Sequence, residues 1–131
     1  MRTSAREAVF KYMFARLFNP SDEGLFAVLC KDLKDDDKNF ASDLMQTILN
    51  NEQTYLDKLQ QLSNGYDVGR IYRVDKCALV IAMAEFDCCP QTPVAVIVDE
   101  YVNLVAKYST ENSTNFVNGI LAEYVKEKTN G

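Results

Sequence analysis

Apolar and polar positions alternate along this chain with the period of an α-helix rather than that of a strand. The pattern is clearest from Pro93 to Tyr124, where residues 94–108 and 116–125 each gather apolar side chains on one face and polar side chains on the other. Pro93 suits a helix start, because its missing N–H would have no partner in the first turn. The polar link of residues 109–113 offers several N-cap side chains. This stretch is therefore predicted to form two amphipathic helices joined by a turn.

The same period predicts helices on the N-terminal side. They are expected from Ser4 to Asn19-Pro20, over residues 21–33, over residues 40–62 and over residues 74–86. Ser4 and Glu7 have the spacing of a capping box, so the first helix is expected to begin there. Asn50-Asn51 could interrupt the long third helix, and Gly65 suits its C-terminal cap. No strand pattern of convincing length appears.

The helix predicted over residues 74–86 is apolar nearly all round, which places it inside a bundle with neighbours on most sides. Only its ends are expected to reach water. The residues concerned are Arg73, Asp75 and Lys76 at the start, and Glu85 and Asp87 at the end. This helix is therefore the predicted central post of the fold.

Two details of the pattern carry further expectations. Extending the apolar stripe of the first helix backwards brings Arg6 and Arg2 into line with it, so their guanidinium groups are expected to reach out at the rim of the core.

In the last helix Asn118-Gly119 would ordinarily signal a hairpin, but its neighbours keep the helical period. A helical glycine costs roughly 1 kcal/mol relative to alanine. Because Asn115, Gly119 and Ala122 share one side, this side is expected to let another backbone come close.

Composition narrows the class of protein. A chain of 131 residues with 47% apolar residues forms one domain with a real core, and its 5 glycines and 3 prolines argue against disorder and against a turn-rich β-sandwich. No apolar run is long enough to span a membrane, and the charged N-terminus does not resemble a signal peptide. A cytoplasmic location is expected. The formal net charge of −5 means that any contact with nucleic acid must come from a local basic patch.

The search for catalytic or metal chemistry finds little. The sequence has no histidine, no C-x-x-C pair among its 4 cysteines and no phosphate-cradling glycine motif, so no catalytic residue, metal or cofactor is predicted. The run Asp35-Asp36-Asp37 lacks the spacing of a calcium loop and is interpreted as a hydrated helix cap. Adjacent Cys88 and Cys89 could oxidise, but free thiols are the plainer interpretation.

The remaining candidates for a functional site are surface features. The N-terminus is basic, and a polar connection precedes Phe116. Basic residues near an aromatic side chain are a recurrent way to hold single-stranded RNA, although the same pattern is common on surfaces without a function. The basic residues concerned are Arg2, Arg6, Lys11 and Arg16.

The order of several motifs resembles that of the NusB family across nearly the whole chain. The most specific is Phe116-Val117-Asn118-Gly119-Ile120-Leu121, which is similar to the signature helix of that family. The others are Ala5-Arg6-Glu7-Ala8, Val74-Asp75-Lys76, Ala84-Glu85-Phe86, Pro93-Val94 and the run from Val98 to Tyr108. Each motif is weak alone, but this order and spacing are hard to obtain by chance.

The resemblance implies an all-α fold of about seven helices in two small packed bundles, a single domain over residues 1–131, and a non-catalytic role. NusB proteins bind boxA-type RNA jointly with the ribosomal protein NusE, and so help the RNA polymerase antitermination complex read through terminators. By position, the resemblance implies that Arg2, Arg6 and Phe116 contact RNA and that Asp75 faces NusE.

The sequence departs from the family pattern at several positions. Thr3-Ser4 interrupt the usual arginine cluster, Val80 follows Leu79 where arginine is usual, Asn115 replaces a basic residue, and Asp99 replaces asparagine. Two alternatives therefore stay open: a NusB-like protein-interaction module that has lost RNA recognition, and an RNA-binding appendage of a ribosomal RNA methyltransferase, which would require a longer chain. Exposed apolar residues could serve NusE or a second copy in a homodimer equally well.

Overall fold

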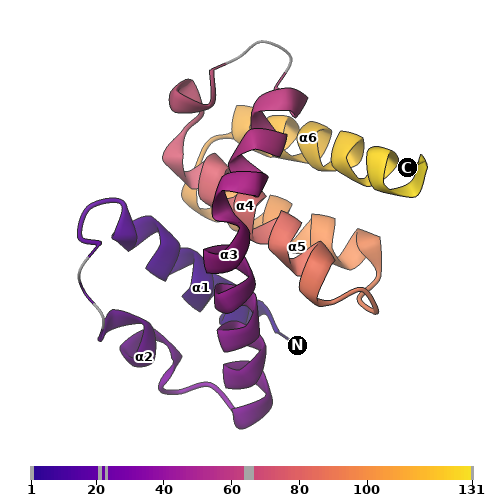
Figure 1. Ribbon diagram of the computed structural model, residues 1–131. Helices are drawn as coiled ribbons and strands as arrows, with labels where there is room; N and C mark the ends of the chain where they lie inside the picture. Colours follow the sequence, from indigo (N-terminus) through magenta and orange to yellow (C-terminus); the bar gives the residue numbers. More distant parts are fainter. Residues whose placement is uncertain (1, 21, 23, 64–66, 131) are drawn as a thin grey trace.

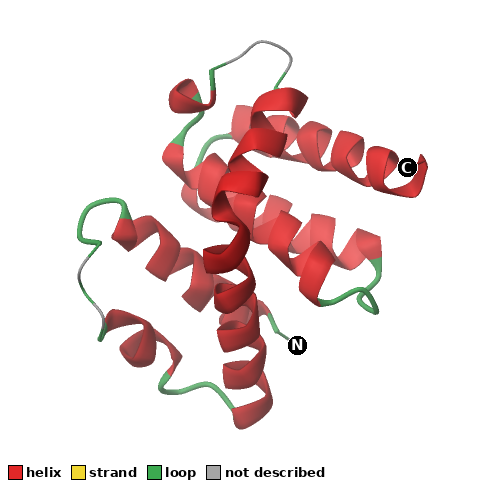
Figure 2. Cartoon of the chain, viewed as in Figure 1, coloured by secondary structure: helices red, strands yellow, loops and turns green. Residues whose placement is uncertain are grey.

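A computed structural model describes residues 2–20, 22, 24–63 and 67–130. These residues form six α-helices, one short 3-10 helix and no strand, which confirms the all-α prediction of about seven helices (Figure 2). The elements are α1 (Thr3–Arg16), α2 (Leu25–Cys30), α3 (Asp35–Leu62), η1 (Val68–Arg70), α4 (Arg73–Cys88), α5 (Val94–Tyr108) and α6 (Glu111–Asn130).

The helices form two groups on either side of the long helix α3. Figure 1 shows α1 and α2 beside the first half of α3, with α4, α5 and α6 gathered on its other side. α1 packs on α2 and α3, while α5 packs on α4 and α6, and the contact between α3 and α4 joins the two groups. This arrangement matches the two small bundles that the resemblance implied.

Helix α4 is the centre of the molecule. It contacts α1, α3, α5 and α6, and every side chain from Ala78 to Ala84 is at most 2% exposed. The predicted central post is therefore confirmed. Its ends differ from the expectation, because Asp75 is 3% exposed and Glu85 is fully buried. Charges near the ends of a helix usually reach water, but here neighbouring helices cover both carboxylates.

Helix boundaries follow the sequence pattern with corrections. α1 begins at Thr3 and Arg2 occupies its N-cap position without a side-chain hydrogen bond, so the expected capping box of Ser4 and Glu7 is wrong. α2 is shorter than predicted. α3 runs unbroken through Asn50-Asn51, where Asn51 donates to the carbonyl of Thr47. The predicted cap at Gly65 lies outside the described residues.

The segments after α1 and before α6 also carry information. α1 ends at Arg16, before the predicted end at Asn19-Pro20, so Leu17 and Phe18 lie beyond it and are 47% and 63% exposed. α6 begins at Glu111, and the hydroxyl of Thr110 accepts a hydrogen bond from the backbone N–H of Ser113. The polar link therefore supplies an N-cap, as predicted.

Gly119 lies within α6, so the helical interpretation of Asn118-Gly119 is confirmed. The expected close approach of another backbone is wrong. A Cβ built at Gly119 meets nothing within 4 Å, and the residue is exposed. No packing contact in the described part of the chain explains the glycine.

Candidate nucleic-acid interface

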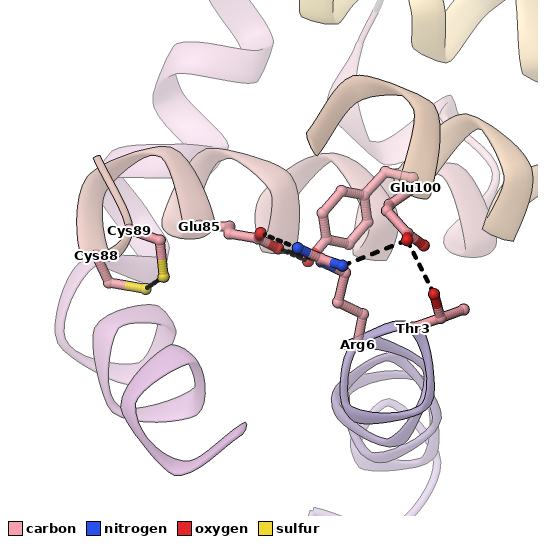
Figure 3. A network of polar contacts seen from close by, with 7 residues as sticks. Thr3, Arg6, Glu85, Cys88, Cys89 and Glu100 are labelled. Atoms are coloured by element: carbon pink, nitrogen blue, oxygen red, sulfur yellow. Dashed lines mark hydrogen bonds and ion pairs between the residues drawn. The ribbon is translucent and has the colours of Figure 1, made fainter. Parts of the chain in front are cut away.

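Arg6 lies inside the molecule rather than at the rim of its core. Its Nε donates to Glu85 Oε1 at 2.8 Å and its Nη2 donates to Oε2 at 2.6 Å, which makes a doubly hydrogen-bonded ion pair between α1 and α4. The Tyr101 hydroxyl donates to Glu85 Oε1 at 2.6 Å, and Glu100 lies 3.4 Å from Arg6 Nη1. Figure 3 shows Arg6 reaching from α1 towards Glu85 and Glu100, with Thr3 also bonded to Glu100.

This network stabilises the charged form of Arg6 inside the protein. Burial opposes the charged form, but the hydrogen bond and negative charge of Glu85 outweigh burial, so the pKa of Arg6 is raised. Burial, followed by the charge of Glu85, raises the pKa of Tyr101 well above its usual value. The prediction that Arg6 presents its guanidinium to solvent is wrong, because its charge is neutralised inside the protein. Its predicted contact with RNA would require breaking this ion pair.

Arg2 is the exposed member of the predicted arginine pair. Its guanidinium carbon lies 4.6 Å from the centroid of the buried Phe40 ring, a cation–π contact that holds its stem on the surface. It forms no ion pair with any described residue, whereas Lys11 pairs with Glu7 and Arg16 pairs with Glu52. Of the four basic residues at the predicted N-terminal patch, Arg2 is therefore the one whose charge is free within the described structure.

Phe116 lies in the wall of a cavity of about 230 Å³ formed where η1 leads into α4 and where α6 begins. The Phe116 side chain is half-buried, whereas Tyr72 beside the cavity is 63% exposed. We call this the η1–α6 cavity. Its lining residues are Arg70, Ile71, Tyr72, Asp75, Asn112, Ser113 and Phe116.

Asp75 is the one buried charged residue among those that line the η1–α6 cavity. Its side chain is 3% exposed, and its Oδ1 accepts no hydrogen bond from any residue that the structure describes. Burial raises the pKa of Asp75, and the hydroxyls of Ser113 and Ser109 oppose that rise by favouring the charged form. Ser113 is itself buried and accepts hydrogen bonds from Ser109 and Thr110. The cavity thus combines aromatic rings with a buried carboxylate of which one oxygen, Oδ1, lacks a donor among the described residues.

The structure does not bring Arg2 and Phe116 together. Arg2 stacks on Phe40 near the start of α3, while Phe116 lines a second cavity with Leu62 at the end of that helix. At 1.5 Å per residue, the helix between Phe40 and Leu62 is roughly 33 Å long. Arg2 and Phe116 therefore lie in different parts of the molecule, and Asp75 is the predicted site residue that shares a cavity with Phe116.

The sequence interpretation missed the residues that accompany Phe116. Arg70 and Tyr72 line the cavity, and Arg73 lies 5.4 Å from the centroid of the exposed Phe18 ring. They sit in or beside the short segment before α4, where no helical period marks a face. The available signal was composition, because residues 70–73 read Arg-Ile-Tyr-Arg, which places one aliphatic and one aromatic side chain between two arginines.

Other chemistry is sparse in the part of the chain that is described. No cluster of three or more potential metal-binding side chains occurs there, and no described helix is both long and apolar enough to cross a membrane. The four cysteines are free thiols, with Cys88 and Cys89 Sγ 3.3 Å apart. Burial raises the pKa of Cys88 to about 12 and that of Cys77 to about 11, so neither is a ready nucleophile at neutral pH.

The fold and this surface define an all-helical, two-bundle protein with a cavity between η1, α4 and α6 that is lined by aromatic rings, Arg70 and Asp75. The model of the NusB family matches residues 2–126. The chain belongs to the NusB family.

Individual relatives agree with this assignment. The chain is 32% identical to the transcription antitermination protein NusB of Acetivibrio thermocellus over 74% of its own length and 67% of that protein. It is 30% identical to the NusB of Carboxydothermus hydrogenoformans over 96% of its own length and 95% of the relative. Alignments with two further NusB proteins cover 58% and 64% of those proteins.

Solved structures share the fold. NusB of T. maritima superposes with a TM-score of 0.91 at 28% identity, covering 97% of this chain and 92% of that one. A chain in the crystal structure of antitermination factors NusB and NusE in complex with dsRNA superposes with a TM-score of 0.85 over 96% of both chains. At 24% identity this second likeness concerns the fold alone.

Proposed function

We propose that this protein is a non-catalytic, cytoplasmic transcription antitermination factor that binds boxA-type RNA together with NusE and so helps RNA polymerase read through terminators. The observation that carries the proposal is the NusB family match over residues 2–126. Relatives named transcription antitermination protein and a NusB fold solved with NusE and RNA support the same role.

The surface supports RNA binding at two places rather than one. Arg70 and Arg2 are exposed and form no ion pair with any described residue, so each can meet a phosphate without first losing a carboxylate partner. Tyr72 and Phe116 add aromatic rings near Arg70, on which unpaired bases stack. Arg2 and Phe116, which the resemblance implies as RNA contacts, then touch different parts of one RNA strand. Arg6 contributes indirectly, because its ion pair with Glu85 joins α1, the helix that Arg2 precedes, to α4.

Charge explains the need for a partner. The net charge of −5 repels RNA at long range, and several cations of the N-terminal region are already paired. The affinity of the protein alone is therefore modest, and NusE raises it by adding contacts to the same RNA. Asp75 stays the predicted NusE-facing residue on the family resemblance. A homodimer is the competing occupant of the exposed apolar residues, and solution mass with and without NusE separates the two.

A binding titration tests the proposal. Fluorescently labelled boxA RNA is titrated with this protein, with NusE, and with an equimolar mixture, and a scrambled RNA of equal length serves as the control. The mixture is expected to bind boxA RNA at least about tenfold more tightly than either protein alone, a coupling of about 1.4 kcal/mol. Equal affinities for the mixture and the single proteins would overturn the joint mechanism.

A protein-interaction module without RNA recognition is the second candidate. The ion pairs of Arg6, Lys11 and Arg16 favour it, because they remove three cations from the predicted patch. It predicts that an Arg2→Ala, Arg70→Ala double variant binds NusE, with or without boxA RNA, as the unchanged protein does. A specific loss of RNA binding in that variant contradicts this candidate.

A further inference from the structure

Two adjacent cysteines lie side by side where α4 ends. The Sγ atoms of Cys88 and Cys89 are 3.3 Å apart, and Figure 3 shows the two sulfurs turned towards one another. Neighbouring side chains of a regular helix point about 100° apart around its axis. Cys89 is the C-cap residue, and its φ of −132° and ψ of 62° depart from helical values. The end of α4 therefore brings two thiols into contact.

One of these two sulfurs is within reach of small molecules. Cys89 lines a cavity of about 220 Å³ between the end of α4, the start of α5 and the last turns of α6, and Cys88 is not among the lining residues. One water molecule needs only about 10–15 Å³ of cavity volume, so a molecule the size of hydrogen peroxide fits. Burial raises the pKa of Cys88 to about 12, so Cys88 stays protonated at neutral pH and reacts second.

We propose that Cys88 and Cys89 form a reversible oxidation site, at which a peroxide joins the two sulfurs in a disulfide bond and thereby distorts the last turn of α4. The Cys89 thiolate attacks one oxygen of hydrogen peroxide, which gives a sulfenic acid on Cys89 and, with the proton that Cys89 released, one water. The Cys88 thiol then attacks the sulfenic sulfur, and the hydroxyl leaves with the Cys88 proton as a second water. Two thiols are oxidised and one peroxide is reduced.

A disulfide between adjacent residues does not fit the present backbone. Consecutive Cα atoms are about 3.8 Å apart, whereas residues joined by a disulfide usually have Cα atoms about 4.4–6.8 Å apart. The chain at residues 88–89 therefore changes conformation when the bond forms. Strained disulfides are reduced more readily than relaxed ones, and those of reducing compartments are usually transient or redox-sensing. Cellular thiols are therefore able to reverse the oxidation.

The last turn of α4 holds several other helices. The N–H of Cys89 donates to the carbonyl of Glu85 at 2.9 Å, and the Glu85 carboxylate binds side chains of α1 and α5. In the same turn, Asp87 accepts hydrogen bonds from Tyr55 of α3 at 2.6 Å and from Lys128 of α6 at 2.8 Å. A distortion of this turn by oxidation therefore weakens contacts to four helices. This effect is independent of the proposed RNA-binding function.

Mass spectrometry tests whether the bond forms. The full-length protein is treated with hydrogen peroxide, remaining thiols are alkylated, and the chain is cleaved after glutamate. Cleavage after Glu85 and Glu100 releases residues 86–100, which contain Cys88 and Cys89 but no other cysteine and no methionine. This peptide is expected to lose two hydrogen atoms and to escape alkylation. Dithiothreitol is expected to restore both thiols.

Urea denaturation measures the consequence. The midpoint of the oxidised protein is expected to fall by about 0.5 M or more, and dithiothreitol is expected to restore it. The control is a Cys88→Ser, Cys89→Ser double variant, whose 4 methionines and two remaining cysteines meet the same peroxide. Its midpoint before and after treatment should be equal. If this variant does not fold, reversal by dithiothreitol still identifies the disulfide, because dithiothreitol does not reduce methionine sulfoxide.

Any of three results overturns the inference. Residues 86–100 can be recovered with both thiols alkylated or with added oxygen atoms, which means that the disulfide does not form. The bond can link two copies of the chain, seen as a doubled mass without reductant. The disulfide can also form while the urea midpoint stays unchanged or falls equally in the double variant, which means that the last turn of α4 does not respond to it.

Discussion

Arg6 and Glu85, which lie 79 residues apart in the sequence, join α1 to α4 through two hydrogen bonds of 2.8 and 2.6 Å. Both side chains are nearly or fully buried, and Tyr101 donates a further bond to the same carboxylate. A buried ion pair is weak evidence for net stability, but removing one partner leaves an uncompensated charge in the interior. The pair therefore matters most when half of it is lost.

Glu85→Ala is expected to lower the free energy of unfolding by about 3–5 kcal/mol, because the Arg6 charge loses its main partner inside the protein. Urea denaturation followed by circular dichroism measures the change. Glu52→Ala is the control, because it removes the partly exposed Arg16–Glu52 pair and should cost about 1 kcal/mol or less. Equal losses in the two variants would show that the buried network has no special role.

Arg2→Ala is expected to reduce affinity for boxA RNA with little effect on stability, because Arg2 is exposed and its contact with Phe40 contributes only about 0.5–1 kcal/mol. If the guanidinium meets one phosphate, the slope of log affinity against log salt falls in magnitude by about 0.7, the value for a single-stranded contact. RNA titrations at salt concentrations between about 50 and 200 mM measure this slope. An unchanged slope would remove Arg2 from the interface.

The fold was largely predictable because apolar residues that recur with the helical period mark the face of each helix that becomes buried. The stripes of residues 94–108 and the apolar run of residues 78–84 give the helices and the central position of α4 without further information. Charges near helix ends were predicted wrongly at Asp75 and Glu85, because a sequence does not show which neighbouring helix will cover them. Each carboxylate is buried by residues distant along the chain.

The candidate site was predictable only in part. Phe116 belongs to a recognisable motif, and the structure places it in the wall of the η1–α6 cavity. Arg6 was assigned to the surface because its partner Glu85 comes 79 residues later, beyond the reach of any local pattern. Arg70 and Tyr72 were missed because their segment contains only a three-residue 3-10 helix and gives no periodic signal.

Gly119→Ala is expected to raise the free energy of unfolding by about 0.5–1 kcal/mol, because alanine favours a helix and its Cβ meets no atom within 4 Å. Thermal or urea denaturation measures this gain. Ala122→Gly, an opposite change at another exposed position of α6, should lower stability by a similar amount. A destabilised Gly119→Ala variant would show that this side of α6 is covered.

Asp75→Asn is expected to change how stability depends on pH. The pKa of Asp75 is raised in the folded protein, so folding is penalised progressively as pH rises from the unfolded-state pKa to the folded-state pKa. The penalty is complete above the folded-state pKa and absent at low pH, where both states are protonated. The variant should therefore be at least as stable as the unchanged protein at pH 7, and this advantage should vanish as pH falls below about 4, near the unfolded value. Urea denaturation across this range checks the sign, and a variant that gains relative stability on acidification contradicts it.

In vitro transcription tests the central claim most directly. RNA polymerase transcribes a template whose leader carries boxA before a terminator, with NusE and the other antitermination factors present, and the fraction of read-through transcripts is measured with and without this protein. The protein is expected to raise read-through on the boxA template and to leave a scrambled-boxA template unchanged. Equal read-through with and without the protein on the boxA template would contradict its assignment as an antitermination factor.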